Sequence, residues 1–82
     1  MSRIMKLLER TRNNPKDVHF EDLDKLMLRA GFECRQPSGG SSHYTYTIEG
    51  CPFPTTVPRK NPVKTVYVKL VIARIEEFGN LE

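Results

Sequence analysis

The chain has 82 residues, of which 38% are hydrophobic and 28% charged, and its formal net charge is +3. We expect a single domain over residues 1–82, because so short a chain leaves no room for a second core or a separate cofactor domain. No apolar run reaches membrane-spanning length and the start lacks the apolar region of a signal peptide, so we expect a cytoplasmic protein without a membrane segment.

Two helices are predicted in the first part of the chain. Ser2 is placed to cap a leading helix over Arg3–Arg12, within residues 1–14, which has a narrow apolar stripe. From Phe20 to Ala30 apolar residues recur at helical spacing, acidic residues occupy the first turn, and Gly31 is placed to end the helix. We expect the second helix to belong to the core and the leading helix to pack on the domain.

Three short strands joined by turns are predicted next. Phe32–Gln36 alternates apolar and polar residues, and Phe53–Pro58 is bounded by prolines, which suits an edge strand because proline donates no ladder hydrogen bond. His43–Glu49 alternates with the period of a half-buried strand, with Tyr44, Tyr46 and Ile48 on one face and His43, Thr45 and Thr47 on the other. We expect the tyrosine face to be buried and the histidine face to meet solvent. The short turns indicate an antiparallel meander.

A last helix is predicted after a turn, with Pro62 able to occupy its first turn and Gly79 placed to end it. Its apolar face consists of Val63, Val66, Tyr67, Leu70, Val71, Ile75 and Phe78. The predicted fold class is therefore α+β in the order α-α-β-β-β-α. A three-stranded antiparallel sheet carries helices on one face and leaves its other face free.

Basic side chains concentrate in the segment that holds the strands. Residues 34–75 contain six Lys and Arg residues against the single acid Glu49, so this segment alone carries a charge of +5. The six bases are Arg35, Arg59, Lys60, Lys64, Lys69 and Arg74. Such a surface attracts a nucleic-acid backbone. A solvated basic face without a partner is the alternative.

A loop of small residues leads into the strand that starts with His43. Amides and hydroxyls of Gly40, Ser41 and Ser42 are suited to contact an anion such as phosphate. An imidazole titrates near neutrality, so His43 can accept a proton and return it. RNA cleavage by a neighbouring 2′-hydroxyl needs such a base but no metal. The segment lacks clustered carboxylates and the two cysteines lack zinc-site spacing, so we expect no metal or other cofactor.

Short motifs occur in a set order between Val18 and Phe78. They are Ala30-Gly31-Phe32, Gly40-Ser41-Ser42-His43, Val57-Pro58-Arg59, and Pro62-Val63-Lys64 followed by Tyr67-Val68-Lys69. In this order and spacing the chain resembles the HicA-type toxins of bacterial toxin–antitoxin systems, over residues 18–78. These toxins are small messenger-RNA interferases with a fold like the double-stranded RNA-binding domain.

The resemblance implies a metal-independent endoribonuclease that cleaves messenger RNA, with His43 as its catalytic residue. It also implies a separately encoded HicB-type antitoxin protein that covers the site. We expect the toxin to be a monomer on its own. Many members carry a second histidine shortly after the Val-Pro-Arg motif, where this chain has Lys60. The role of that second histidine is not carried over to Lys60.

We predict that His43 is the general base. The RNA-binding residues predicted beside it are Gly40, Ser41 and Ser42 on the scissile phosphate, and Arg59, Lys60 or Lys64 stabilising its charge. The acid that protonates the leaving oxygen stays open between a lysine, a tyrosine and His43 acting twice. His19 is given a capping or surface role at the start of the second helix.

Two other functions are compatible with the same residues. The first is a non-catalytic RNA-binding module that uses the sheet and the basic helix for shape recognition. The second is a protein-interaction domain whose basic face meets an acidic partner. The alternative hypothesis for His43 is that it is a surface or hydrogen-bonded structural histidine.

Overall fold

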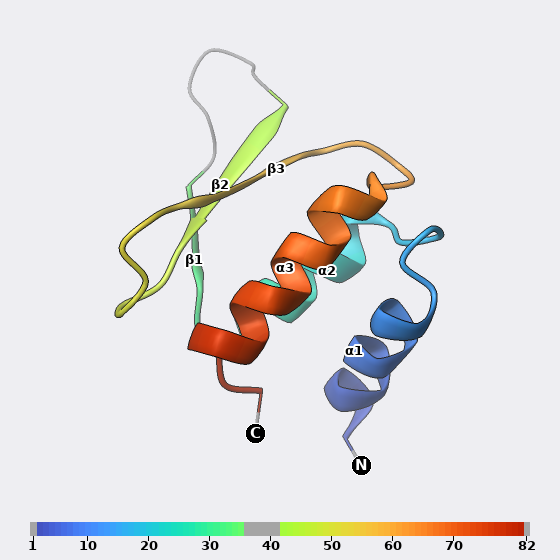
Figure 1. The fold of residues 1–82 in the computed structure, drawn as a ribbon, viewed down its shortest axis with the longest axis horizontal. Coiled ribbons are helices and arrows are strands. Elements are labelled where there is room, and N and C mark those ends of the chain that lie inside the picture. Colours follow the sequence, from blue (N-terminus) through green and yellow to red (C-terminus); the bar gives the residue numbers. More distant parts are fainter. Residues whose placement is uncertain (1, 36–41, 82) are drawn as a thin grey trace.

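The computed structural model describes residues 2–35 and 42–81. Within these ranges the chain forms three helices and three strands in the predicted order, an α+β fold with an open antiparallel sheet (Figure 1). The elements are α1 (Arg3–Asn13), α2 (Phe20–Arg29), β1 (Glu33–Arg35), β2 (His43–Thr47), β3 (Thr55–Pro58) and α3 (Thr65–Phe78). None of the helices in the described ranges has the length and apolar character needed to cross a membrane.

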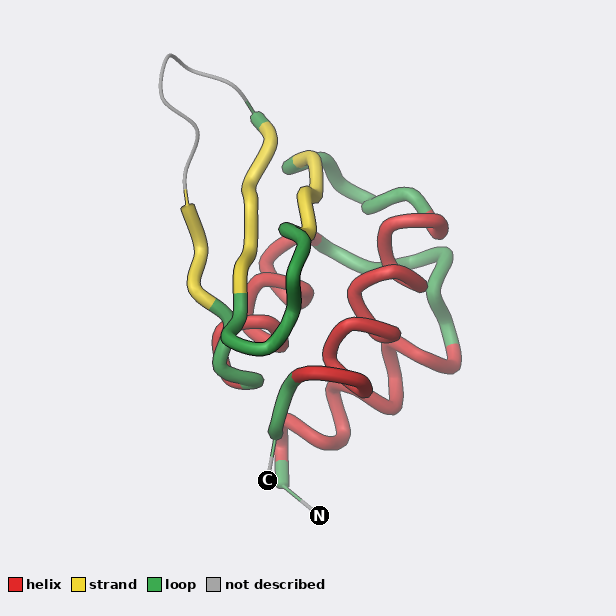
Figure 2. Tube along the Cα trace, turned by 60° about the vertical axis from the view of Figure 1, so that its left-hand side comes forward, coloured by secondary structure: helices red, strands yellow, loops and turns green. Residues whose placement is uncertain are grey.

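The helices lie on one face of the sheet in two layers. α2 contacts β1 and α3 contacts β3, so these two helices cover the sheet. α1 contacts α2 and α3 and lies on the side of this pair away from the strands (Figure 1). Within the described residues no helix covers the other face of the sheet (Figure 2). Among the described residues, the helix-free sheet face that the sequence predicts is therefore present.

The sheet is a meander with β2 in its centre. Its register pairs Cys34 with Tyr46 across β1 and β2, and Tyr44 with Val57 across β2 and β3. β3 lies at the edge of the sheet, as its flanking prolines predict.

All three strands are shorter than their sequence pattern predicts. β1 begins at Glu33 rather than Phe32, and Gln36 lies outside the described residues. β2 ends at Thr47 because the chain already turns at Glu49. β3 begins at Thr55, because the Phe53 ring lies outside the ladder and stacks under the Arg74 guanidinium, whose central carbon is 4.2 Å from the ring centroid. This cation–π interaction stabilises the exposed Phe53 ring in its position outside the sheet.

The core lies between the sheet and the α2/α3 pair. Its most deeply buried apolar side chains, none more than 1% exposed, are Leu23, Leu26, Met27, Tyr46, Val57, Val68 and Val71. Each fully buried aliphatic side chain stabilises the fold by roughly 1.5–3 kcal/mol relative to exposure. The tyrosine face of β2 packs inward, as the alternation predicts.

The start of α2 is held by a distant loop. The Phe20 N–H donates a hydrogen bond to Asn61 Oδ1 at 2.7 Å, while the His19 side chain, at the N-cap position, makes no capping hydrogen bond. Asn61 thus takes the capping role suggested for His19, whose side chain is exposed. Because this loop is tied to α2, α3 begins only at Thr65 and Pro62 lies outside it.

α3 is rotated relative to its predicted face. Val66 is 66% exposed, whereas Val68 and Ile72 are buried together with Val71 and Ile75. α3 contacts α1, α2 and β3, so a wide part of its circumference is buried. Apolar residues of α3 itself also occupy most of its circumference. Periodicity alone therefore does not determine which side of the helix is buried.

Glycines end both core helices. Gly31 has a left-handed φ of +105° after α2, a conformation that glycine adopts without strain. Gly79 ends α3, and its N–H donates to the Ile75 carbonyl at 2.9 Å. A Cβ atom at Gly79 would lie 2.8 Å from the Ala30 Cβ, so the two helix ends meet where no methyl group fits. The predicted helix ends are confirmed.

Candidate functional site

His43 is the first residue of β2, and its side chain is exposed as predicted. Its neighbour Tyr44 faces the helices, because the Tyr44 and Phe20 ring centroids are 5.0 Å apart. Successive strand residues point to opposite faces of a sheet, so His43 lies on the open face. The imidazole is therefore exposed on the side of the sheet that no described helix covers.

A row of polar side chains crosses the open face beside His43. The register places Arg35, Thr45 and Thr56 next to one another, and the two threonine hydroxyl oxygens lie 3.3 Å apart. Arg35 is therefore the diagonal neighbour of His43 on the same face, at a Cα separation of about 7–8 Å in standard sheet geometry. Arg35 is one of the six bases of residues 34–75, but its place beside His43 was not predicted from the sequence. Only the pairing of β1 with β2 brings it there.

Ser42 and Arg59 meet at the same end of the sheet. The Arg59 N–H donates to the Ser42 carbonyl at 2.7 Å, which extends the β2–β3 ladder by one pair. The Arg59 guanidinium, however, donates to the Tyr44 hydroxyl at 3.4 Å and lies 3.9 Å from the Glu21 carboxylate. The hydrogen bond that the guanidinium donates to the Tyr44 hydroxyl raises the pKa of Arg59, so the guanidinium stays charged. It lies on the helix side of β2, opposite the His43 side chain.

The other predicted site residues are only partly brought together. Gly40 and Ser41 lie outside the described residues. Lys60 is exposed just beyond the end of β3, the strand that pairs with the start of β2. Lys64 is exposed at the N-cap of α3, at the far end of the loop that caps α2. Lys60 follows shortly after Pro58, the residue that pairs with His43, whereas Lys64 lies further along the chain.

The tyrosines of β2 do not suit the role of a general acid for the leaving oxygen. Tyr46 is 1% exposed and donates to Asp24 Oδ1 at 2.6 Å. Burial, this hydrogen bond and the nearby charge raise the pKa of Tyr46 well above its ordinary value. The Tyr44 hydroxyl is engaged with Arg59 on the helix side.

The two cysteines are free thiols in the structure. Cys34 is partly buried beside Tyr46, and burial raises the pKa of its thiol. Cys51 donates to the Phe53 carbonyl at 3.2 Å. Among residues 2–35 and 42–81, no group of three or more histidine, cysteine or acidic side chains is placed to hold a metal ion.

Comparisons with protein-family models, with curated proteins and with solved structures returned no match for this chain.

Proposed function

We propose that this chain is a metal-independent endoribonuclease with a fold like the double-stranded RNA-binding domain. The observation that carries the proposal is the exposed His43 on an uncovered sheet face, with Arg35 beside it in the register of β1 and β2. The order α2-β1-β2-β3-α3, with both helices on one face of the sheet, supports the fold assignment. The excess of bases in residues 34–75, of which Arg35 lies on this face, supports RNA as the ligand.

Within this class, the proposal is a HicA-type toxin of a bacterial toxin–antitoxin system that cleaves messenger RNA. Its support is the motif Gly40-Ser41-Ser42-His43, followed at the family spacing by Val57-Pro58-Arg59 and by the motifs of the last helix. A HicB-type antitoxin would neutralise the toxin by covering the open sheet face.

In the proposed reaction His43 removes the proton of a ribose 2′-hydroxyl. The 2′-oxygen then forms a bond to the adjacent phosphorus, and the bond from phosphorus to the 5′-oxygen of the next nucleotide breaks. That oxygen takes up a proton from a lysine or from protonated His43. The products are a 2′,3′-cyclic phosphate and a 5′-hydroxyl end. Arg35, Lys60 and the loop amides before His43 stabilise the negative charge that builds on the phosphate.

The test compares the wild type, His43→Ala and His19→Ala on a labelled messenger-RNA fragment in excess EDTA. His19 is the matched control because it too is exposed. Wild type and His19→Ala are expected to cleave equally fast and to leave cyclic-phosphate and 5′-hydroxyl ends. His43→Ala is expected to lose about 10²–10⁴-fold in rate, the usual contribution of a positioned base. Equal cleavage by His43→Ala, or 5′-phosphate ends, would contradict the mechanism.

A non-catalytic RNA-binding module is the second candidate. One observation favours it, namely Lys60 where many HicA-type toxins carry a second histidine. The module predicts RNA binding that weakens with salt, no cleavage products, and equal RNA affinity for wild type and His43→Ala. The same gel and a binding titration separate the two candidates.

A further inference from the structure

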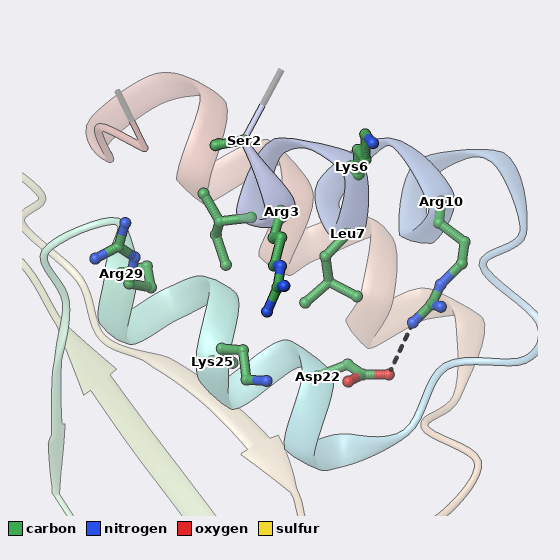
Figure 3. Close-up of a pocket in the computed structure, with 9 residues that line it drawn as sticks. Ser2, Arg3, Lys6, Leu7, Arg10, Asp22, Lys25 and Arg29 are labelled. Atoms are coloured by element: carbon green, nitrogen blue, oxygen red, sulfur yellow. Dashed lines mark hydrogen bonds and ion pairs between the residues drawn. The ribbon is translucent and has the colours of Figure 1, made fainter.

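α1 and α2 enclose a groove with a volume of ≈ 680 Å³, lined by residues of both helices (Figure 3). Ile4 and Leu7 of α1 contribute apolar surface, and Figure 3 shows Leu7 pointing from α1 toward α2. The basic side chains that line it are Arg3, Lys6 and Arg10 from α1 and Lys25 and Arg29 from α2. Asp22 is the single acid among the lining residues.

The fold gathers these charges from a segment that is almost neutral overall. Residues 1–33 contain seven Lys and Arg residues and six acids, yet five of the bases and only one of the acids line the groove. Arg10 forms an ion pair with Asp22, at 3.4 Å between Nη2 and Oδ2. The other four bases form no ion pair with a described residue. Their mutual repulsion is relieved by a bound anion.

We propose that this groove binds an acidic amphipathic segment of a partner protein. Acidic side chains of the segment meet the two rows of bases, and its apolar side chains cover the exposed part of Leu7. The bases of α1 from Arg3 to Arg10 extend over about 10 Å of helix at 1.5 Å per residue. Two turns of a partner helix match this length.

Other anionic ligands suit the groove less well. No aromatic side chain is among its lining residues, so an RNA strand finds no platform for base stacking. Phosphate groups also gain nothing from the apolar surface. A bilayer surface requires apolar side chains that project outward, whereas Leu7 points into the groove toward α2, where a narrow peptide segment can contact it.

The groove is separate from the open sheet face, because α1 lies beyond the α2/α3 pair as seen from the strands (Figure 1). A partner bound there leaves His43 accessible. The inference therefore stands independently of RNA cleavage, and its failure does not affect the nuclease proposal.

The test is fluorescence anisotropy with a labelled synthetic peptide of about three helical turns, with leucines on one face and glutamates on the other. It compares wild type, Lys25→Glu/Arg29→Glu in the groove, and Lys16→Glu/Lys69→Glu as a control with the same change in charge. Lys16 and Lys69 are exposed and do not line the groove. Wild type and control are expected to bind equally. The groove variant is expected to bind at least about tenfold more weakly, because each reversal removes an attraction and adds a repulsion.

Leu7→Ala tests the apolar contact without a change in charge. It is expected to weaken peptide binding about threefold, the effect of losing part of one apolar contact, and thermal melting checks that the variant folds. Equal binding by the groove variant and the control overturns the proposal, as does equal binding by Leu7→Ala and wild type. Single-stranded RNA and vesicles of anionic phospholipid are titrated in parallel. If RNA or vesicles bind to wild type but not to the groove variant, and the peptide does not bind, the ligand is not an acidic protein segment and the proposal is overturned.

Discussion

Tyr46 joins the centre of the sheet to α2 through a single hydroxyl. Its ring is 1% exposed in the core, and its hydroxyl donates to Asp24 Oδ1 at 2.6 Å. A buried phenol costs little free energy only when its hydroxyl has an acceptor. His43 lies three residues earlier on the same strand. The hydrogen bond to Asp24 therefore also fixes the strand that presents the imidazole.

Tyr46→Phe is expected to lower the free energy of unfolding at neutral pH by about 1–3 kcal/mol, because Asp24 loses its donor. The pKa of Tyr46 is raised in the folded protein above its unfolded value of about 10. The stabilisation is therefore complete below about pH 10 and is lost as the pH rises further. Denaturant unfolding between about pH 7 and pH 11 measures both effects.

The control for this prediction is Tyr67→Phe, which removes a half-buried phenol hydroxyl that bonds to no described residue. It is expected to change the free energy of unfolding at neutral pH by less than about 0.5 kcal/mol. Wild type should lose stability above about pH 10 more steeply than Tyr46→Phe. Parallel losses in the two proteins would show that the Tyr46 hydroxyl is not the group that titrates.

At the residue scale, sequence reasoning succeeded where the signal is local. Alternation along β2 was enough to place His43 outside and Tyr46 inside. Arg35 was missed as a neighbour of His43 because its position depends on the register between two strands. Asn61 was missed as the cap of α2 because 41 residues separate it from Phe20, and no local pattern links them.

At the element scale, the ends of α2 and α3 meet in a close contact at Gly79. The Asn80 N–H donates to the Ala30 carbonyl at 3.0 Å, directly after Gly79. A methyl group at Gly79 would also lie 3.0 Å from the Ile75 carbonyl oxygen. Neither neighbour is the end of a flexible side chain, so the helices themselves must move apart to accept a methyl group.

Gly79→Ala is therefore expected to lower the free energy of unfolding by about 1–3 kcal/mol. For a domain of this size the melting temperature falls by roughly 4–8 °C per kcal/mol. The double variant Gly79→Ala/Ala30→Gly removes the opposing methyl group and is expected to recover part of the loss. Thermal melting of the four proteins in this cycle measures the coupling. A strictly additive cycle would show that the Ala30 contact is not the cause.

The elements themselves were largely predictable, because periods of 2 and 3.6 residues are properties of the sequence. The rotation of α3 was not. Val66 belongs to the predicted apolar face and is 66% exposed, while Ile72 is buried. α1, α2 and β3 together select the buried side of α3, and their positions are known only after the chain has folded.

For the whole molecule, the α2/α3 pair separates two surfaces with different chemistry. The open sheet face carries His43, Arg35 and a row of threonines, and the groove between α1 and α2 carries five bases around apolar side chains. The sequence predicted the first surface through the alternation that places His43 on the solvent side of β2 and through the basic segment 34–75, of which Arg35 lies on that face. The groove could not be predicted from the sequence, because acids and bases nearly balance over residues 1–33 and separate only when α1 packs on α2.

If RNA binds on the open face, as we propose, replacing two exposed arginines should change RNA binding to different extents. Arg35→Ala is expected to weaken RNA binding several-fold and to lower the slope of log affinity against log salt by about one unit, because its charge lies on the face of His43. Arg59→Ala removes the same charge on the helix side, where Tyr44 and Glu21 hold the guanidinium, so it should change both quantities less. Anisotropy titrations of labelled RNA over a range of salt compare them. A larger loss for Arg59→Ala would place the RNA over the helix side of β2 instead, and His43 would then lie on the wrong face to reach the scissile phosphate.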